Sequence, residues 1–132
     1  LYASGSWSPD GRRFAHVVTR RGDNEVVITD VDRGRLWRRV RVAGVQSISA
    51  VAWSPDGRRL AIAGTRHGQP DLWLYDLQER DLSRLTNDPY AELQPAWSPD
   101  GRWLAVATDY GPAQDLESLA FGRLQVMLLD PV

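Results

Sequence analysis

The sequence predicts an all-β chain built from about three copies of one structural unit. The pentapeptide Trp-Ser-Pro-Asp-Gly occurs at residues 7–11, 53–57 and 97–101, at spacings of 46 and 44 residues. Each copy lies between short apolar segments that have the length and composition of β-strands. A repeat period in the forties with such segments is typical of four-stranded propeller blades. We therefore predict a β-propeller fragment of about three four-stranded antiparallel blades, the last of them incomplete.

The second repeat shows the predicted blade most clearly. Residues 54–57 predict a tight turn, because Pro55 presets φ for the second turn position and Gly57 accepts the left-handed position that follows. This turn joins two strands, and two more strands follow in the same repeat. The four predicted strands are Ile48–Trp53, Arg59–Gly64, Leu72–Asp76 and Leu82–Leu85.

The other two repeats follow the same order with one large difference. The predicted strands after the first turn are Phe14–Thr19, Val26–Asp30 and Leu36–Val42, and those after the third are Trp103–Thr108 and Leu124–Asp130. The third repeat lacks a fourth strand and carries an insertion of about ten residues within 109–123, where Leu116, Leu119 and Ala120 have helical spacing. The predicted blades are about 1–44, 45–88 and 89–132, so residues 1–132 form one partial propeller.

The recurring tryptophans and turn residues are interpreted as scaffold. The turn explains its aspartates locally, and each tryptophan returns in phase with the repeat, as blade-core residues do. This phase disfavours the alternatives, a carboxylate set for acid–base chemistry or a stacking platform for sugars or bases. The structural repeat motif comprises Trp7, Pro9, Asp10, Gly11, Trp53, Pro55, Asp56, Gly57, Trp97, Pro99, Asp100 and Gly101.

Small side chains recur where neighbouring blades must pack closely. Ala15, Ala61 and Ala105 occupy equivalent positions in the strands that follow the turns. One blade cannot bury both faces of its own sheet, so adjacent blades must cover them. Propellers have about four to eight blades, and three blades alone leave two faces uncovered. We expect the remaining blades of a larger ring, or self-association, to cover these faces.

The composition of the 132-residue chain narrows the classes of partner. The formal net charge is −1, although residues 1–44 carry nine arginines and five acids and residues 45–132 carry seven arginines and twelve acids. The chain as a whole lacks the basic excess of nucleic-acid-binding proteins. Its apolar runs are far shorter than the ~18 residues needed to span a membrane. We therefore expect neither nucleic-acid binding nor membrane insertion.

Side chains for catalysis or cofactor binding do not occur in a recognisable pattern. The chain has no cysteine, and its two histidines, His16 and His67, lack the spacing of zinc ligands. It contains no Gly-x-Ser-x-Gly nucleophile motif and no glycine-rich phosphate loop. His16 replaces Ile62 and Val106 of the sister repeats and is interpreted as a packed strand residue. We predict that the chain is not an enzyme and has no catalytic residues, no metal and no cofactor.

One face of the predicted propeller is favoured as a binding surface. Loops between the second and third strands emerge on the same face as the connectors between blades, and the insertion is one of these loops. Loops longer than about a dozen residues are often functional. The candidate binding residues are Asp109, Tyr110, Asp115, Glu117, Arg66, His67 and Tyr90, with Arg20, Arg21 and Asp88 on the same face. The alternative is a loop that only covers the edge of a neighbouring blade.

The repeats resemble those of the TolB-type β-propeller family. In the second repeat the turn motif is followed by Arg-Arg-Leu-Ala, then by Leu-Trp-Leu-Tyr-Asp-Leu, then by Ser-Arg-Leu-Thr. The resemblance spans the whole chain in three in-phase copies. The first repeat departs from the pattern in its fourth strand, where residues 35–40 read Arg-Leu-Trp-Arg-Arg-Val in place of the Leu-Thr ending.

The resemblance implies a fold more than an activity. Similar propellers act as partner-binding platforms in bacterial envelope proteins. The resemblance therefore implies a non-catalytic interaction or scaffold segment of an exported protein, periplasmic or extracellular, with a protein or peptide partner. It leaves open an accessory propeller of a peptidase (prolyl-oligopeptidase-like, tricorn-like or metallopeptidase-linked) whose catalytic domain lies outside this chain. A third alternative is an enzymatic site at the channel of the propeller itself.

Overall fold

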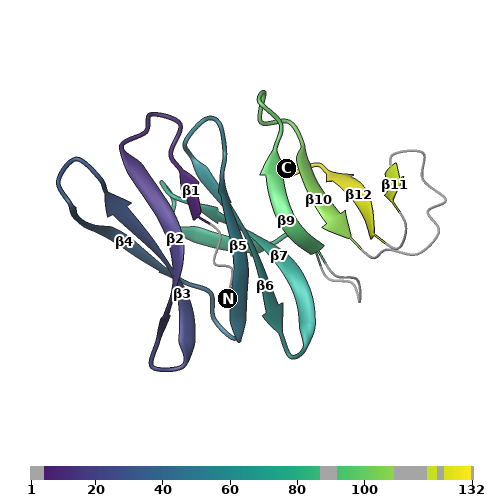
Figure 1. The fold of residues 1–132 in the computed structure, drawn as a ribbon, viewed down its shortest axis with the longest axis horizontal. Coiled ribbons are helices and arrows are strands. Elements are labelled where there is room, and N and C mark those ends of the chain that lie inside the picture. The colour runs from purple at the N-terminus through teal and green to yellow at the C-terminus, as the bar shows by residue number, and fades with distance from the viewer. Residues whose placement is uncertain (1–4, 87–91, 109–118, 122–123, 132) are drawn as a thin grey trace.

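The computed structural model describes residues 5–86, 92–108, 119–121 and 124–131, and all regular structure in this part of the chain is β (Figure 1). The strands are β1 (Gly5–Trp7), β2 (Arg13–Arg20), β3 (Asp23–Asp30), β4 (Arg35–Arg41), β5 (Ser47–Trp53), β6 (Arg59–Arg66), β7 (Gln69–Asp76), β8 (Asp81–Arg84), β9 (Glu92–Trp97), β10 (Leu104–Thr108), β11 (Leu119–Phe121) and β12 (Leu124–Leu129). The described residues include no helix that could cross a membrane.

The strands form three antiparallel sheets that stand side by side in an open arc (Figure 1). Sheet 1 contains β1 to β4 and sheet 2 contains β5 to β8, both in chain order, whereas sheet 3 has the order β9, β10, β12, β11. Strand β5 contacts β1 on one side and β9 on the other. The prediction of an all-β propeller fragment with about three antiparallel blades is confirmed.

The three pentapeptide turns share one hydrogen-bond pattern, because their geometry is fixed locally. In the first, the backbone N–H of Gly11 donates to Ser8 O at 2.9 Å, and Gly11 has a φ of 71°. The Ser8 hydroxyl donates to Asp10 Oδ1 at 2.6 Å and accepts from the backbone N–H of Arg13 at 2.9 Å. Asp10 Oδ1 also accepts from the backbone N–H of Arg12 at 3.0 Å. The same bonds recur in the second and third turns.

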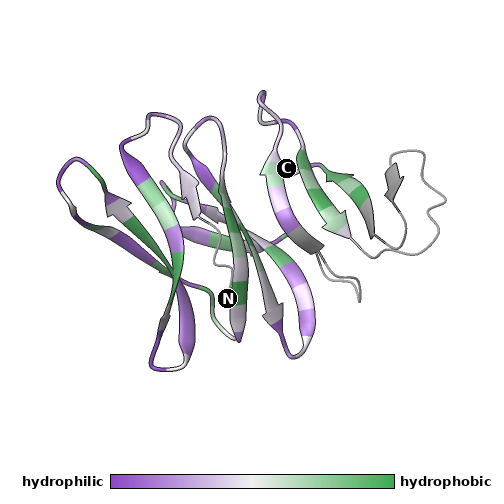
Figure 2. Cartoon of the chain, viewed as in Figure 1, coloured by the Kyte–Doolittle hydropathy of each residue, from purple (hydrophilic) through white to green (hydrophobic). Residues whose placement is uncertain are grey.

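Two apolar clusters join the three sheets, and β6 contributes to both (Figure 2). Leu60 and Ile62 pack toward sheet 1, while Ala61 and Ala63 pack toward sheet 3. All four side chains have no exposed surface. Large and small side chains therefore alternate along β6. The large ones fill the space between sheets 2 and 1, and the small ones allow sheet 3 to pack closely on the other face.

The structure differs from the prediction of a short helix within the insertion at residues 109–123. Leu119 and Ala120 lie in the short strand β11, which pairs antiparallel with β12 through Leu119 opposite Val126. The predicted short helix is therefore wrong for these two residues, and Leu116 lies outside the described residues. A segment that pairs with the free edge of β12 forms backbone hydrogen bonds with a strand that is already ordered. A short isolated helix would instead have to form its first turn unaided, which is unfavourable. The edge is thus taken by three residues from within the insertion, and sheet 3 lacks a full-length fourth strand.

The repeat tryptophans differ in burial, because Trp53 and Trp97 pack in the apolar clusters between the sheets and Trp7 does not. Trp53 is 7% exposed and Trp97 is half-buried, with its Nε1–H donating to Ala52 O of the neighbouring sheet at 3.1 Å. Trp7 is 55% exposed and contacts the ring of Phe14 at a centroid distance of 5.0 Å. Among the described residues, no sheet precedes sheet 1, so nothing covers this face of β1 and β2.

Candidate functional site

The structure describes only part of the predicted binding set. Arg66 ends β6 and His67 follows it in the turn to β7, and both side chains are exposed. The other predicted binding residues, Asp109, Tyr110, Asp115, Glu117 and Tyr90, lie outside the described residues, as does Asp88. The candidate site is therefore built from the β2–β3 and β6–β7 turns and the connector between sheets 1 and 2, which we call the loop-bearing face.

The two turns on the loop-bearing face have the same backbone geometry. Arg21 and Gly22 have φ values of 53° and 86°, and His67 and Gly68 have values of 51° and 75°. Two successive positive φ angles are those of a type I′ turn, whose twist matches that of the strands it joins. The first turn thus presents the exposed side chains of Arg20 and Arg21 at its tip. The second presents those of Arg66 and His67.

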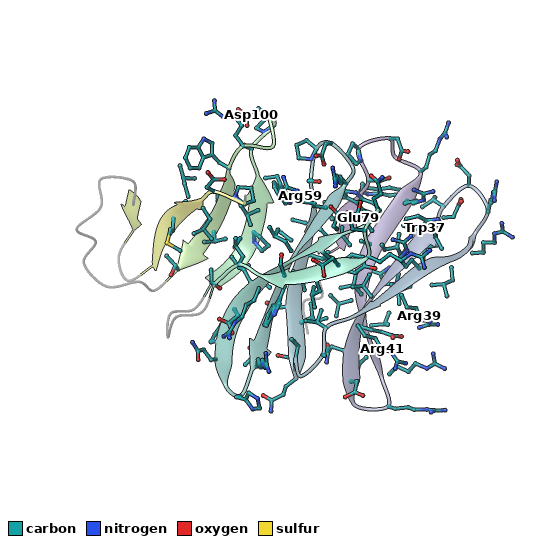
Figure 3. The ribbon with its side chains drawn as sticks, turned by 180° about the vertical axis from the view of Figure 1, so that it is seen from behind. Trp37, Arg39, Arg41, Arg59, Glu79 and Asp100 are labelled. Carbon is teal, nitrogen blue, oxygen red and sulfur yellow. The ribbon has the colours of Figure 1, made fainter. Side chains whose placement is uncertain are left out.

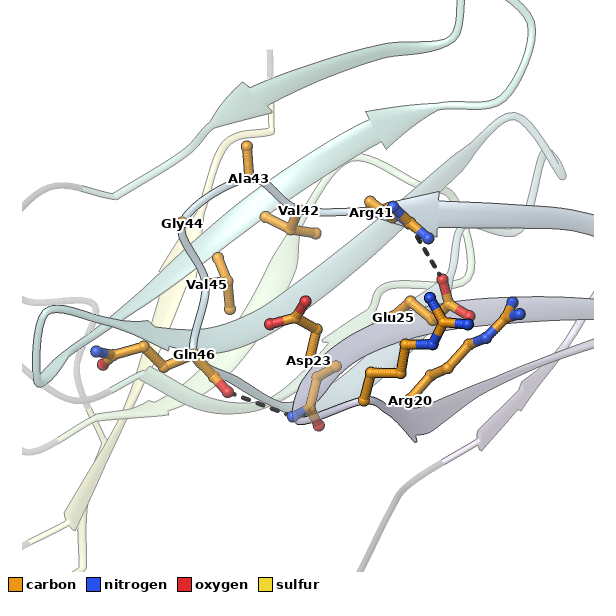
Figure 4. Close-up of a pocket in the computed structure, with 11 residues that line it drawn as sticks. Arg20, Asp23, Glu25, Arg41, Val42, Ala43, Gly44, Val45 and Gln46 are labelled. Carbon is orange, nitrogen blue, oxygen red and sulfur yellow. Dashed lines mark hydrogen bonds and ion pairs between the residues drawn. The ribbon is translucent and has the colours of Figure 1, made fainter.

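A hollow of about 540 Å³ lies between the β2–β3 turn and the connector of residues 42–46 (Figure 4). Asn24 Nδ2 donates to Gln46 O at 3.3 Å, which ties the turn to the connector. The side chains of Val42 and Val45 in the connector are buried, and the Asp23 carboxylate points into the space beside them. The sequence alone could not reveal this hollow, because its two walls come from segments that meet only in the fold.

Gly44 gives the connector its close contact with the second turn. Its φ is 76°, and a Cβ at this position would lie 3.4 Å from Nε of Arg66. A side chain here would strain the backbone through the positive φ, while its Cβ would only touch the guanidinium of Arg66. This contact brings Arg66 from sheet 2 to the connector, beside the hollow that Arg20 and Arg21 line from sheet 1.

A buried carboxylate organises one wall of the hollow. Glu25 is 3% exposed and pairs with Arg39 and, at 3.4 Å, with Arg41. Burial acts to raise the pKa of Glu25, but the hydrogen bonds and charges of the two guanidinium groups outweigh it and lower the pKa. Arg20 and Arg21 make no ion pair with another described residue and remain exposed. Their N–H groups are available to carboxylates or carbonyl oxygens of a partner.

Sheet 2 repeats the buried acid, which sequence reasoning had missed. Asp71 occupies the position of Glu25 in its own third strand, has no exposed surface and pairs with Arg84 of the fourth strand. Alignment of the two repeats already shows an acid at the same position of the third strand and arginine in the fourth. Whether these residues form ion pairs depends on the register of the two strands, which only the fold reveals.

A second hollow, of about 600 Å³, follows β1, β5 and β9. Its walls contain the three repeat tryptophans and the prolines of the turns, together with alanine, serine and glutamine. None of the residues that line it carries a titratable side chain. Across the described residues, no group of three or more His, Cys, Asp or Glu side chains is placed to hold a metal ion. This groove can therefore bind by shape and stacking but lacks its own acid or base.

Comparison with known families gives a match to the family described as the TolB beta propeller domain, over residues 1–116. Among solved structures, a protein assigned as TolB from Agrobacterium tumefaciens superposes with a TM-score of 0.78 at 25% sequence identity, over 99% of this chain and 46% of that chain. No curated protein sequence matches the chain.

Two further structures are similar in fold. TolB from Acinetobacter baumannii gives a TM-score of 0.73 at 23% identity, over 96% of this chain and 29% of that chain. The tricorn protease gives a TM-score of 0.69 at 18% identity, over 96% of this chain and 13% of that chain. The chain thus spans less than half the length of each of these three structures.

Proposed function

The chain belongs to the TolB β-propeller family, and on that premise we propose that it is a non-catalytic interaction module that binds a protein or peptide partner through its loop-bearing face. The observation that carries the proposal is the hollow between the β2–β3 turn and the connector, flanked by the exposed side chains of Arg20 and Arg21, which form no ion pair with a described residue. Arginine side chains bind carboxylates and carbonyl oxygens with defined geometry, so this face suits a polar protein surface.

The hollow along β1, β5 and β9 favours a role in binding over one in catalysis. Acid–base chemistry needs a titratable group within hydrogen-bond reach of the reacting atoms. The groove along β1, β5 and β9 is lined by residues without such a group. The carboxylates with lowered pKa, such as Asp10 and Asp100, are instead held in turns by their own serine and backbone donors.

The second candidate function is an accessory propeller of a peptidase. The similarity of the chain to part of the tricorn protease favours it, although at 18% identity that similarity concerns the fold. In this case the catalytic residues belong to another domain of the same protein. A nucleophile motif or a His-Glu-x-x-His zinc motif in the flanking reading frame would favour this second candidate over the first.

The proposal also includes partners that cover the outer faces of sheets 1 and 3, and a location outside the cytoplasm. Trp7 on sheet 1 and Leu128 on sheet 3, which is 39% exposed, are large apolar residues that further blades of the same propeller or a second copy would cover. The family membership also supports an exported, periplasmic or extracellular protein, which fractionation of cells expressing the full reading frame would test.

The binding proposal is tested by site-specific photocrosslinking in cells that express the full-length protein. A photoreactive amino acid replaces Arg21 or His67 on the loop-bearing face, and Arg80 or Arg102 in turns at the opposite ends of the strands serves as the matched control. We expect crosslinks to a defined partner from the first two positions only. Purified partner should then lose affinity for R20Q/R21Q/R66Q but not for R12Q/R80Q/R102Q, which removes the same charge. Equal loss in both triple variants would contradict the proposal.

A further inference from the structure

The most basic segment of the chain forms the outer edge of sheet 1. Residues 33–43 contain five arginines and no acid. Most of this segment is strand β4, the last strand in sheet 1, which pairs with β3 through residues such as Val40 opposite Val26. In the described part of the chain no strand pairs with the other edge of β4. Figure 3 shows Arg39 and Arg41 on this side of the molecule, away from sheets 2 and 3.

This edge differs from the outer edges of the other two sheets. β4 has seven residues, whereas β8 has four and β11 has three. β8 also begins with Asp81 and ends with Arg84, so its charges are mixed. Short or mixed edges offer little to an incoming strand. Of the three outer edges, that of β4 is therefore the longest.

The charges on β4 are only partly neutralised. Arg39 and Arg41 share one carboxylate, that of Glu25, so the three groups together keep one positive charge. Arg35 forms no ion pair with a described residue, and both Arg35 and Leu36 are exposed. The edge therefore combines free positive charge with an exposed apolar side chain.

The neighbouring residues hold the edge in a fixed shape. The pairing of Ile28 with Arg38 and of Thr29 with Leu36 leaves Trp37 as an extra residue, a β-bulge. The guanidinium of Arg38 lies 4.4 Å from the Trp37 ring centroid, and its Nη1 also donates to Leu77 O of sheet 2. The guanidinium of Arg13 lies 3.8 Å from the same centroid, so the indole lies close to two cations. The bulge turns Trp37 toward sheet 2, while the rest of β4 up to Arg41 pairs regularly with β3.

We infer that the free edge of β4 is a docking site for an acidic, extended segment of a partner protein, which adds as a strand to sheet 1. Arginines repel a second copy of the same edge, so the charges that prevent self-pairing select a strand of opposite charge. Arg39 and Arg41 are two residues apart, about 7 Å along the strand and on one face. A partner strand with acids at alternate positions repeats at the same distance and presents carboxylates to both. This site adjoins the proposed binding hollow, with which it shares Arg41 and Glu25. It differs from that hollow because it uses the strand edge and not the turns.

The test measures binding of a fluorescein-labelled peptide of alternating Glu and Thr to the whole protein by fluorescence anisotropy. We expect binding that weakens with added salt, and about fivefold or greater loss of affinity in R35Q/R39Q. R80Q/R102Q removes the same charge from exposed positions outside sheet 1 and should bind like wild type. Circular dichroism establishes that each variant is folded, because Arg39 supports the buried Glu25.

Two peptide controls and one comparison with other anions keep the inference falsifiable even if R35Q/R39Q fails to fold. Replacing every Glu of the peptide with Gln should abolish binding, because the positive charge that Glu25 leaves on Arg39 and Arg41 then meets no carboxylate. Methylating every backbone nitrogen should also abolish it, because a strand that adds to an edge needs its N–H donors and alternate methylation would leave one edge of the peptide free. Undiminished binding of the methylated peptide would overturn strand addition. Single-stranded DNA or anionic lipid vesicles that bind equally tightly and compete with the peptide would overturn selection of an acidic peptide.

Discussion

Sheets 1 and 2 carry the same repeat but differ in how many neighbours they have. Sheet 2 is packed between two sheets, and Trp53, Leu60 and Ile62 on its face toward sheet 1 are buried. The equivalent residues of sheet 1 are Trp7, Phe14 and His16, of which Trp7 is exposed and the other two are half-buried. The same local sequence thus gives the same turn and strand, whereas burial depends on what lies across the face.

The uncovered face of sheet 1 is also more polar than its counterpart. His16 stands where sheet 2 has Ile62, and its ring stacks on Phe14 at a centroid distance of 5.8 Å. The His16 Nδ1 atom is buried and has no hydrogen-bond partner among the described residues. A residue that covers this face therefore needs to supply both apolar contact for Trp7 and a polar atom for His16.

The largest expected difference between the two sheets is at the tryptophans. W53A removes a buried ring and should lower the free energy of unfolding by about 3–5 kcal/mol. W7A removes a ring that is 55% exposed and should cost less than about half as much. Chemical denaturation followed by circular dichroism measures both. Equal losses would show that another blade or a second copy covers Trp7 in solution.

The buried acids give the next largest difference. R84Q leaves Asp71 buried without its only ion-pair partner among the described residues and should cost about 3 kcal/mol of unfolding free energy. R41Q should have a much smaller effect, because Arg39 still pairs with Glu25 and Arg41 is itself 79% exposed. Thermal unfolding of the two variants compares them directly. A larger effect of R41Q than of R84Q would contradict this ranking.

The sequence allowed prediction of those features that local chemistry determines. The turns were predictable because proline, aspartate and glycine fix the backbone within five residues, and the structure has one hydrogen-bond pattern at all three. The exposure of Trp7 was not, because it depends on a sheet across the face. The strand β11 was not, because helical spacing at Leu119 and Ala120 says nothing about the free edge of β12. The hollow at Gly44 and the Glu25 ion pairs were missed because their parts meet only through strand register and connector path.

Substitutions of the turn glycines should erase the difference between sheets 1 and 2. Gly11 and Gly57 have φ values of 71° and 75°, which an alanine adopts at a cost of about 1 kcal/mol. A Cβ at Gly11 would meet no atom within 4 Å, and one at Gly57 would have only ordinary contact with Pro9. G11A and G57A should therefore lower the unfolding free energy by similar amounts in denaturant titrations. A clearly larger loss in G57A would mean that packing against the neighbouring turn, and not the backbone, sets the cost.

Acid should weaken all three turns, with the smallest expected effect per site. The hydrogen bonds from the Ser8 hydroxyl and the backbone N–H of Arg12 lower the pKa of Asp10. Burial acts to raise the pKa of Asp56, but its equivalent hydrogen bonds outweigh this and lower it as well. Because the folded-state pKa lies below the unfolded value, each carboxylate contributes stability at neutral pH that is lost as the pH falls through the folded pKa, below about 3.9.

The variant D10N isolates this contribution in sheet 1, and D56N isolates it in sheet 2. Asparagine keeps an acceptor oxygen but has no charge to lose, so each variant should be less stable than wild type near neutral pH and should approach wild type as the pH falls. Urea midpoints at about pH 7 and about pH 3 measure the stability difference between each variant and wild type, which we call the gap. Because the bonds to serine and backbone are the same in both turns, the gaps should close over the same pH range in the exposed and the covered sheet. A gap at Asp10 that persists in acid would show that its carboxylate acts through shape and not through charge.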